Sequence, residues 1–338
     1  MTMISQVHHH STVSTTKIRV EWHSEWSVEV AAAFEILPYD SLMDPTLVRT
    51  LWEGGVGRDR QKIALLRSPE GEAVGVVPLR KRGKLSWQLL TQYVMPYARF
   101  FVLPEYTDAA IAALGSEIDC DNVIFNRAPA NIRMLRPEES WVVSLPSTYD
   151  ELLVRTKYGN KDRRYRRETA HLEMREDDFA ALPDSLCHWQ EKWTAAGSYA
   201  TAARKDDLLL CFQTLAGLGK LKTFSLHDRE IVASMGIGML AGDTMYAITK
   251  VSRDAYRDCH AGIRLTLAAM EWGCQNGIAE YDMLRTSGEY KGKWAEPEIR
   301  SYRMIRRPLG SEILGCALEN IKDILRNRRK KASGKVSL

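Results

Sequence analysis

The side chains best placed to do chemistry lie together late in the chain, between residues 280 and 291. Asp282 supplies a carboxylate, Tyr290 a phenol and Lys291 an amine. A carboxylate can accept a proton from an amine or anchor it, a phenol can protonate a leaving group, and a lysine ammonium can hold an anion. Structural alternatives stay open for each: Asp282 could pair with Arg285 or Lys291, Tyr290 could pack, and Lys291 could be a solvated loop residue.

Residue spacing disfavours several other kinds of active site. The six cysteines include no Cys-x-x-Cys pair, and the one histidine cluster, at 8–10, lies in a Ser/Thr-rich leader. We therefore expect no metal site and reduced thiols, as in a cytoplasmic protein. No Gly-x-Ser-x-Gly motif marks a serine hydrolase. We find neither a signal peptide nor a run of about 18 apolar residues that could span a membrane.

The net charge of +4 on 338 residues conceals two basic segments. Seven basic residues and one acid lie between 155 and 167, and the same numbers lie between 322 and 335. Each segment carries +6, so the rest of the chain carries −8. A general attraction to nucleic acid or membranes is therefore not expected, and an anionic partner would meet one of these two patches.

Strands and helices alternate through the first half of the chain. Alternating apolar residues predict a strand over 17–23, and helical spacing predicts a helix over 27–37 that Pro38 ends. Strands over 62–67 and 73–80 form a predicted hairpin, and the Pro69-Glu70-Gly71 turn joins them. The other predicted elements are helices after Asp44-Pro45 and over 108–117, and strands over 86–92, 99–103, 122–126 and 140–145.

The sequence pattern of the second half predicts helices followed by an antiparallel sheet. A helix starts at 147–150, and the basic run continues as a helix or a helix–turn–helix to about 169. Three strands joined by hairpin turns then lead into a helix over 262–275. The remaining predictions are helices over 180–195, 205–218 and 311–327, strands over 221–226, 231–240 and 244–251, and strands over 280–284 and 299–305.

The loop before the helix at 262 reads Arg257-Asp258-Cys259-His260-Ala261-Gly262. With three strands before it and a helix after it, this segment resembles the acyl-CoA N-acyltransferase (GNAT) superfamily, whose loop pattern is Arg/Gln-x-x-Gly-x-Gly/Ala. His260 stands where the first glycine is expected. In that superfamily the coenzyme A pyrophosphate binds backbone N–H groups at the helix N-terminus. The resemblance implies cofactor contacts at Arg257, His260, Ala261 and Gly262.

A second resemblance runs from about Trp26 to Arg307. The segments 74–80 (VGVVPLR), 163–167 (RRYRR), 281–285 (YDMLR) and 288–291 (GEYK) are similar in order and spacing to the CelD-like acetyltransferases, a GNAT branch associated with exopolysaccharide synthesis. Like the FemAB ligases, that branch has two tandem GNAT-like domains. The implied fold class is α/β, with tandem GNAT-like mixed sheets.

Acyl transfer to nitrogen requires a held thioester, a polarised carbonyl and an uncharged amine. A free alkylamine has a pKa of about 10, so a base or a desolvating pocket must supply its neutral form. The resemblance places the acyl-pantetheine between strands 246–251 and 280–284, where backbone N–H groups polarise the carbonyl. It implies cofactor contacts from Thr249, Lys250 and Val251, and catalytic roles for Asp282 as base, Lys291 as fixed charge and Tyr290 as acid, with Trp294 covering the cleft.

Three interpretations remain open for the basic run at 155–167. Arg163 and Arg167 share a helix face, and Tyr158 and Tyr165 are interleaved with the cations. The run could edge the substrate cleft, hold RNA as FemAB-type enzymes hold aminoacyl-tRNA, or form a solvated face. We expect Arg163, Arg167 and Arg285 to contact substrate. The C-terminal basic tail could touch an anionic lipid surface, weakly and in a salt-sensitive manner.

The sequence therefore predicts an acyl-CoA-dependent N-acyltransferase, with acetyl as the expected acyl group and a small-molecule or sugar-derived amine as acceptor. We expect no sequence-specific nucleic acid partner. The alternatives are a FemAB-like aminoacyl-tRNA-dependent ligase and a non-catalytic GNAT-fold scaffold in polysaccharide assembly. The expected organisation is a disordered leader over 1–16, a degenerate GNAT-like domain over 17–146, the transferase domain over 147–310, and a helix with a basic tail over 311–338. The acceptor, acyl length and oligomeric state stay open.

Overall fold

The computed structural model describes residues 17–37, 44–55, 60–82, 86–125, 135–156, 158–195, 202–285 and 291–304. The first half contains a five-stranded sheet of order β1-β2-β3-β4, in which β6 also pairs with β3. Helices α1 and α2 begin where Ser27 and Asp44 accept hydrogen bonds from backbone N–H groups of the first turn. The elements are β1 (Arg19–His23), β2 (Gln61–Arg67), β3 (Ala73–Arg82), β4 (Ser86–Leu89), β6 (Phe101–Val102), α1 (Val28–Ile36), α2 (Pro45–Gly54) and α3 (Thr107–Leu114).

A second sheet of nine strands passes through both halves of the molecule, in the order β5-β7-β14-β8-β13-β12-β11-β10-β9. The β5–β7 and β12–β13 pairs are parallel, and the other pairs are antiparallel. Its strands are β5 (Ala98–Arg99), β7 (Cys120–Ile124), β8 (Leu135–Ser144), β9 (Glu173–Glu176), β10 (Leu221–Asp228), β11 (Ile231–Ala241), β12 (Thr244–Ser252), β13 (Glu280–Asp282) and β14 (Pro297–Met304).

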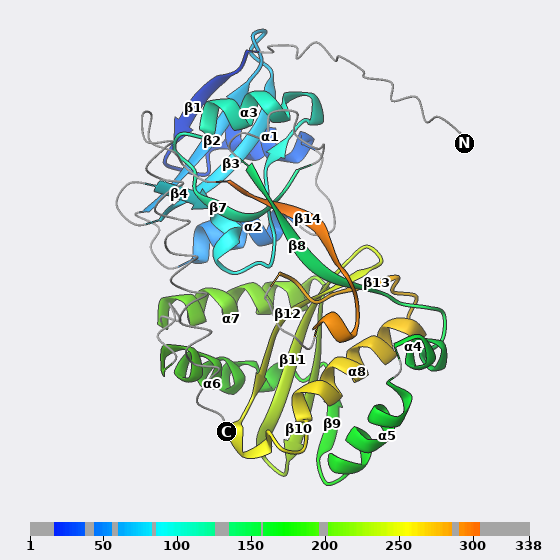
Figure 1. Ribbon diagram of the computed structural model, residues 1–338. Coiled ribbons are helices and arrows are strands. Elements are labelled where there is room, and N and C mark those ends of the chain that lie inside the picture. The colour runs from blue at the N-terminus through cyan, green and yellow to red at the C-terminus, as the bar shows by residue number, and fades with distance from the viewer. Residues whose placement is uncertain are drawn as a thin grey trace, which may run out of the picture.

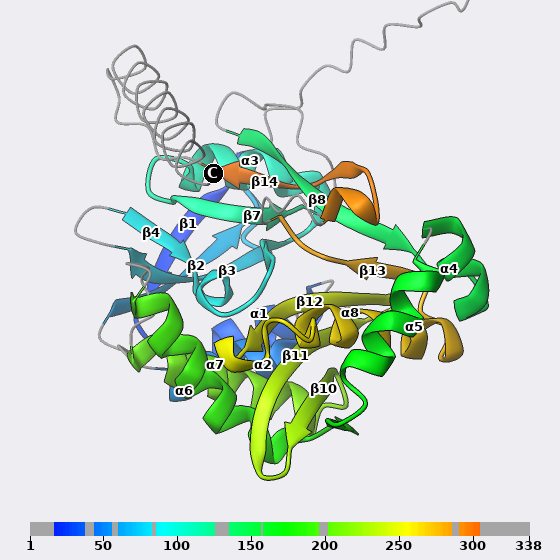
Figure 2. The same ribbon diagram turned by 60° about the horizontal axis from the view of Figure 1, so that its bottom comes forward.

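Strands β8 and β14 join the two halves. The long strand β8 pairs with β14 along most of its length and with β13 at its end, between Val142 and Ser144. The late strand β14 returns to the first half, where it also pairs with β7. Figure 1 shows both strands crossing between the upper and lower parts of the molecule, and Figure 2 shows β8 beside β7 and β14 and continuing toward α4. One hydrophobic core likewise contains residues of both halves, including Val48, Phe212 and Met235.

Helices cover both faces of the sheet formed by β10, β11 and β12. Helix α8 packs on one face, while α6 and α7 pack on the other (Figure 1). Burial on both faces explains why β11 is apolar over nearly its whole length, whereas the equally buried β10 also carries polar side chains, such as Lys222 and His227, that form hydrogen bonds. The helices of this half are α4 (Tyr149–Thr156), α5 (Gly159–Glu168), α6 (Leu182–Ala195), α7 (Ala202–Gly217) and α8 (Ala261–Gln275).

Most of the elements predicted from periodicity appear within a few residues of their expected bounds, with five differences. Strand β8 begins at Leu135, five residues before the strand predicted over 140–145, and the strand predicted over 99–103 is divided into β5 and β6, which belong to different sheets. Strand β9, which pairs with β10, was not predicted. The strand predicted over 86–92 ends at Leu89, where the chain enters a 3₁₀ turn. The strand predicted over 280–284 ends at Asp282, because Leu284 adopts a left-handed conformation with φ of 60°. The leader and the C-terminal helix and tail lie outside the described residues.

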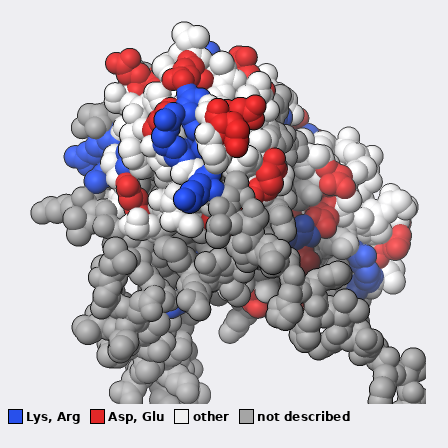
Figure 3. Space-filling view, turned by 90° about the horizontal axis from the view of Figure 1, so that it is seen from above, with Lys and Arg blue, Asp and Glu red and all other residues white. Residues whose placement is uncertain are grey.

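The charges of the described first half are mixed in sign. In Figure 3, which views the molecule from above, Lys and Arg side chains lie beside Asp and Glu side chains. Arg67, for example, bonds Glu21 and Glu29, and Lys62 bonds Glu117 at 2.6 Å. The basic residues on this face are therefore partly neutralised by acidic neighbours.

Candidate active site

The parallel strands β12 and β13 separate soon after they pair. Their ladder joins Thr244–Tyr246 to Glu280–Asp282 and ends there. On its other edge β12 carries a β-bulge, because its pairing with β11 skips Ile248. A bulge bends a strand and releases a residue from the ladder. The described strands therefore open into a gap that begins at Tyr246 and Asp282.

A cavity of about 440 Å³ lies at this gap. Folded interiors contain few voids larger than a water molecule, so a hollow of this size has the dimensions of a ligand site. Its walls come from β10, β11, β12, α8 and the segment after β13. The lining residues are Trp193, Phe224, Gly236, Ile237, Gly238, Met245, Ala247, Ile248, Thr249, Lys250, Leu265, Thr266, Ala269, Tyr281, Met283, Leu284 and Lys291.

Two lysines line this mainly apolar cavity. Lys250 donates a hydrogen bond of 2.9 Å to Oγ1 of Thr266, and Lys291 donates to the carbonyl oxygens of Met283 and Leu284. Burial, together with the charge of Lys291, lowers the pKa of Lys250 to about 8, and burial lowers the pKa of Lys291 to about 8 although the charge of Asp282 raises it. At neutral pH both remain mainly protonated, so the cavity holds two ammonium groups.

The N-terminus of α8 lies beside Lys250. A Cβ added at Gly262 would lie 3.0 Å from Oγ of Ser252 and 3.4 Å from Cε of Lys250, so the glycine permits close packing. The N-cap residue His260 has φ of 58°, the left-handed conformation that glycine adopts without strain. Its side chain makes no capping hydrogen bond, and its Nδ1 lies 3.0 Å from Glu168. His260 is thus half-buried.

Asp282 points away from the cavity. Its carboxylate accepts hydrogen bonds from the hydroxyls of Tyr97 at 2.8 Å and Ser140 at 2.5 Å, and from the backbone N–H of Leu284 at 2.7 Å. Burial raises the pKa of Asp282, and these donors offset part of that effect. The bond to Leu284 turns the chain, so that the carbonyls of Met283 and Leu284 reach Lys291.

Comparison with known proteins agrees with this geometry. Residues 154–292 match the family described as the acetyltransferase (GNAT) domain. Together with the two mixed sheets, this match confirms the predicted α/β fold class of tandem GNAT type. No curated protein matches the chain.

Solved structures with similar folds cover most of the chain. A conserved protein of unknown function from Bacteroides thetaiotaomicron is 10% identical, with a TM-score of 0.51, over 84% of this chain and 98% of that one. The C-terminal domain of a putative lysylphosphatidylglycerol synthetase from Agrobacterium fabrum is 14% identical, with a TM-score of 0.50, over 86% and 96%. FemX is 14% identical, with a TM-score of 0.49, over 87% and 99%.

The structure brings some of the predicted site residues together and separates others. Thr249, Lys250 and Lys291 line the cavity, whereas Val251 is buried in the core on the opposite face. Arg257 is exposed in the loop before α8. Trp294 stacks on Tyr158, with ring centroids 3.8 Å apart, and does not line the cavity. Tyr290 lies outside the described residues.

The predicted substrate arginines lie away from the cavity. Arg163 and Arg167 are exposed on α5, and Arg163 lines a separate open groove of about 740 Å³ between α4 and α5. Arg285 pairs with the buried Glu138 at 2.6 Å rather than with Asp282. Elsewhere in the basic run, Arg166 bonds Asp162 and Glu271, and Arg164 bonds Glu168. The second basic segment, 322–335, lies outside the described residues.

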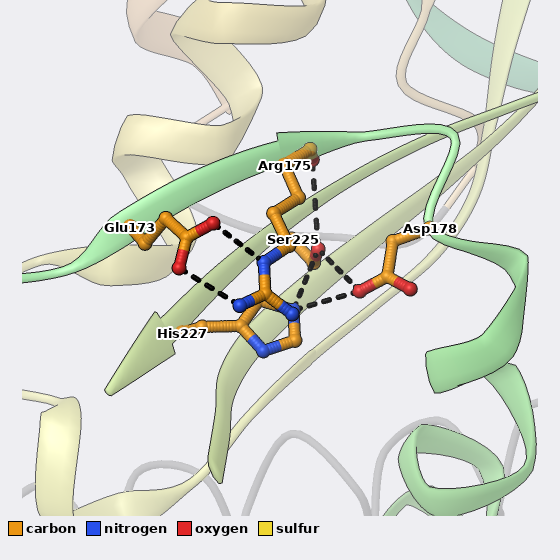
Figure 4. A network of polar contacts seen from close by, with 5 residues as sticks. All are labelled: Glu173, Arg175, Asp178, Ser225 and His227. Atoms are coloured by element: carbon orange, nitrogen blue, oxygen red, sulfur yellow. Dashed lines mark hydrogen bonds and ion pairs between the residues drawn. The ribbon is translucent and has the colours of Figure 1, made fainter. Parts of the chain in front are cut away.

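A Ser–His–Asp cluster at the sheet edge does not have the geometry of a catalytic triad (Figure 4). Nε2 of His227 lies 2.7 Å from Oδ2 of Asp178 and 3.0 Å from Oγ of Ser225. A triad relay uses one imidazole nitrogen for the acid and the other for the nucleophile, whereas here one nitrogen contacts both. Ser225 is also fully buried. We therefore assign the cluster a structural role, joining β9 to β10.

Two features are absent from the described part of the chain. No helix there is long and apolar enough to cross a membrane. No group of three or more His, Cys, Asp or Glu side chains there is arranged to hold a metal ion.

Sequence reasoning missed several residues of the site. Tyr97 and Ser140, which bond Asp282, come from the first half of the chain. Gly236 and Gly238, which line the cavity, are two residues apart on one face of β11. This glycine spacing within an apolar strand is a signal that the sequence does carry, because such glycines mark close approach of a neighbour or a ligand. No local pattern singles out Tyr97 or Ser140.

Proposed function

We propose that this protein transfers an acyl group from acyl-coenzyme A to the amine of a small acceptor. The observation that carries the proposal is the gap between β12 and β13, with a cavity in it and the N-terminus of α8 at one end. An extended thioester substrate needs this combination. Its charged end requires backbone N–H donors, and its reactive end requires a dry pocket.

The residues at the N-terminus of α8 fit a pyrophosphate group. The first N–H groups of a helix have no intrahelical partner, and the helix dipole favours an anion there. The side chain of His260 turns to Glu168 and leaves this end uncapped. Gly262 keeps the first turn free of a Cβ, and the ammonium of Lys250 adds positive charge within the neighbouring cavity. Bound coenzyme A supplies the thioester whose acyl carbon is transferred.

Lys291 is the cavity residue best suited to stabilise negative charge on the reacting carbonyl oxygen. Its ammonium is buried, and the carbonyls of Met283 and Leu284 orient it at the gap. A fixed charge in a water-excluded site needs little reorganisation during the reaction. Backbone N–H groups near the Ile248 bulge are the second candidate donors. In this assignment Lys291 acts electrostatically and forms no covalent bond.

In the transfer, the acceptor nitrogen forms a bond to the acyl carbon and the carbon–sulfur bond breaks. The amine loses one proton, and the departing thiolate gains one. Asp282 as the base and Tyr290 as the acid stay predictions. Every oxygen of Asp282 already accepts a hydrogen bond, and its side chain faces the first half of the protein. A proton could reach Asp282 only from an acceptor that approaches from that side.

We also propose membership of the CelD-like branch, on the motifs at 74–80, 163–167, 281–285 and 288–291. Exopolysaccharide synthesis and a sugar-derived amine belong to the same proposal. Acetyl-CoA is the first donor to test. The two alternatives to an acyl-CoA-dependent enzyme are a ligase that uses an aminoacyl-tRNA donor and a scaffold without catalytic activity.

Thermal unfolding in the presence of ligands tests the proposed function. A ligand that binds only the folded state raises its stability by about 2.7 kcal/mol at one hundred times its dissociation constant. We expect CoA and acetyl-CoA to raise the unfolding temperature, and uncharged or aminoacylated tRNA to leave it unchanged. Stabilisation by aminoacyl-tRNA alone would favour the ligase. The absence of any shift with CoA species would refute the acyltransferase.

A further inference from the structure

One part of the cavity reaches well beyond the gap between β12 and β13. On the face covered by α8 it extends across β11 to Phe224 on β10. Neighbouring strands lie about 4.8 Å apart, so this extension crosses two strand spacings, roughly 10 Å. We call it the apolar lobe; its residues are Phe224, Gly236, Gly238, Met245, Leu265 and Ala269.

Missing side chains create the apolar lobe. Gly236 pairs with Phe224 of β10 and with Lys250 of β12, so it lies in the middle of the sheet floor under α8. A Cβ at Gly236 would have its nearest neighbour, the Cβ of Leu265, at 3.7 Å, an ordinary contact distance. A side-chain carbon would therefore fit at Gly236, where a strand residue under a helix normally packs, whereas Met245 already fills the corresponding place beside Gly238. Ala269 leaves similar room from the helix side.

One polar side chain, Lys250, borders the lobe, because it pairs with Gly236 across the β11–β12 ladder. Lys250 bonds Thr266 near the start of α8, and Lys291 lies at the gap. The lobe itself is lined by hydrocarbon, with a flexible methionine, Met245, in its wall. A thioester whose carbonyl lies near Lys291 would thus have an apolar pocket to receive its acyl chain.

We propose that the acyl donor carries a medium-length aliphatic chain, longer than acetyl, which lies in the apolar lobe between β11 and α8. This inference rests on the proposed acyl-CoA function and narrows its substrate class. Burial of each methylene is worth about 0.8 kcal/mol, which corresponds to roughly fourfold in affinity. The lobe therefore makes affinity depend on chain length, which an acetyl-sized site would not do.

Titration calorimetry with CoA, acetyl-CoA, hexanoyl-CoA and octanoyl-CoA tests the proposal on the intact protein. We expect the dissociation constant to fall at least tenfold from acetyl-CoA to octanoyl-CoA. Gly236→Val fills the lobe from the sheet side and should reduce this preference to threefold or less. Gly217→Val is the matched control, because a Cβ at Gly217 on α7 meets nothing within 4 Å. It should leave the ratio unchanged.

Smaller variants keep the test decisive if Gly236→Val does not fold. Gly236→Ala adds one carbon at ordinary contact distance, and Ala269→Leu fills the lobe from the helix side. Each should lower the ratio of octanoyl-CoA to acetyl-CoA affinity. Equal binding of all the esters, with a ratio of octanoyl-CoA to acetyl-CoA affinity that these variants do not change, would refute the proposal that the apolar lobe binds an acyl chain. It would not contradict the proposed acyltransferase function. Failure of every CoA ester to bind would overturn both proposals.

Discussion

The hydroxyl of Tyr97 donates a hydrogen bond of 2.8 Å to the carboxylate of Asp282, across 185 residues of sequence. Asp282 in turn accepts the N–H of Leu284, and the carbonyl of Leu284 accepts a hydrogen bond of 2.9 Å from Lys291. The first half of the protein is therefore connected through three hydrogen bonds to a lysine in the cavity. Four measurements follow from these contacts.

Replacement of Tyr97 by Phe should destabilise the fold by about 1–3 kcal/mol, because a buried carboxylate loses one of its donors. Chemical denaturation at neutral pH measures the difference. Tyr106→Phe removes a hydroxyl from a half-buried tyrosine of the same half and serves as the control. Equal losses in the two variants would show that the bond to Asp282 contributes no more than an ordinary tyrosine hydroxyl.

Asp282→Asn should move the loss of the Lys291 charge to lower pH. The negative charge of Asp282 raises the pKa of Lys291, which burial has lowered to about 8. Its removal therefore lowers that pKa further, and the alkaline limb of the activity profile should shift toward acid. If Asp282 is instead the general base, Asp282→Asn should abolish turnover and leave no alkaline limb to measure. Asp121→Asn, at an aspartate paired with Arg303, controls for loss of a carboxylate elsewhere.

Lys291→Met should lower kcat/KM by about a hundredfold, the usual effect of removing one charge-stabilising donor. Methionine keeps most of the buried volume, so the fold should survive. Lys293→Met changes an exposed lysine in the same short turn and should leave turnover within twofold of the parent protein. Steady-state kinetics with a CoA ester compare the two variants. Similar activity in both would remove Lys291 from the mechanism.

Stability should rise with pH between about 8 and 10.5. The pKa values of Lys250 and Lys291 are about 8 in the folded protein, against an ordinary value of 10.5. In that window the unfolded chain binds more protons, so each lysine adds up to about 1.4 kcal/mol of unfolding free energy per pH unit. Below pH 8 both states are protonated and the penalty is constant. Lys250→Met should flatten the slope and stabilise the protein at pH 7; a slope equal to that of the parent would contradict the buried charge.

Local pattern in the sequence was sufficient for most of the elements. Helical spacing of apolar residues predicted α8, and the turn residues at 228–229 and 241–243 predicted the hairpins of β10, β11 and β12. The motif at 257–262 located the start of α8. The sequence also singled out Lys291, which the structure shows to be buried. These features depend on residues within a few positions of one another, which is the range over which side-chain periodicity and turn chemistry act.

Only the tertiary structure decided how the two halves meet. Strands β8 and β14 join them in one sheet, Tyr97 and Ser140 bond Asp282 from the first half, and β13 ends at Asp282 because its carboxylate bonds Leu284. The sequence identifies Asp282 as a carboxylate that could accept a proton. It does not reveal the direction in which the Asp282 side chain points. That direction depends on contacts between residues far apart in the chain, formed when the cores pack, and no local pattern encodes them.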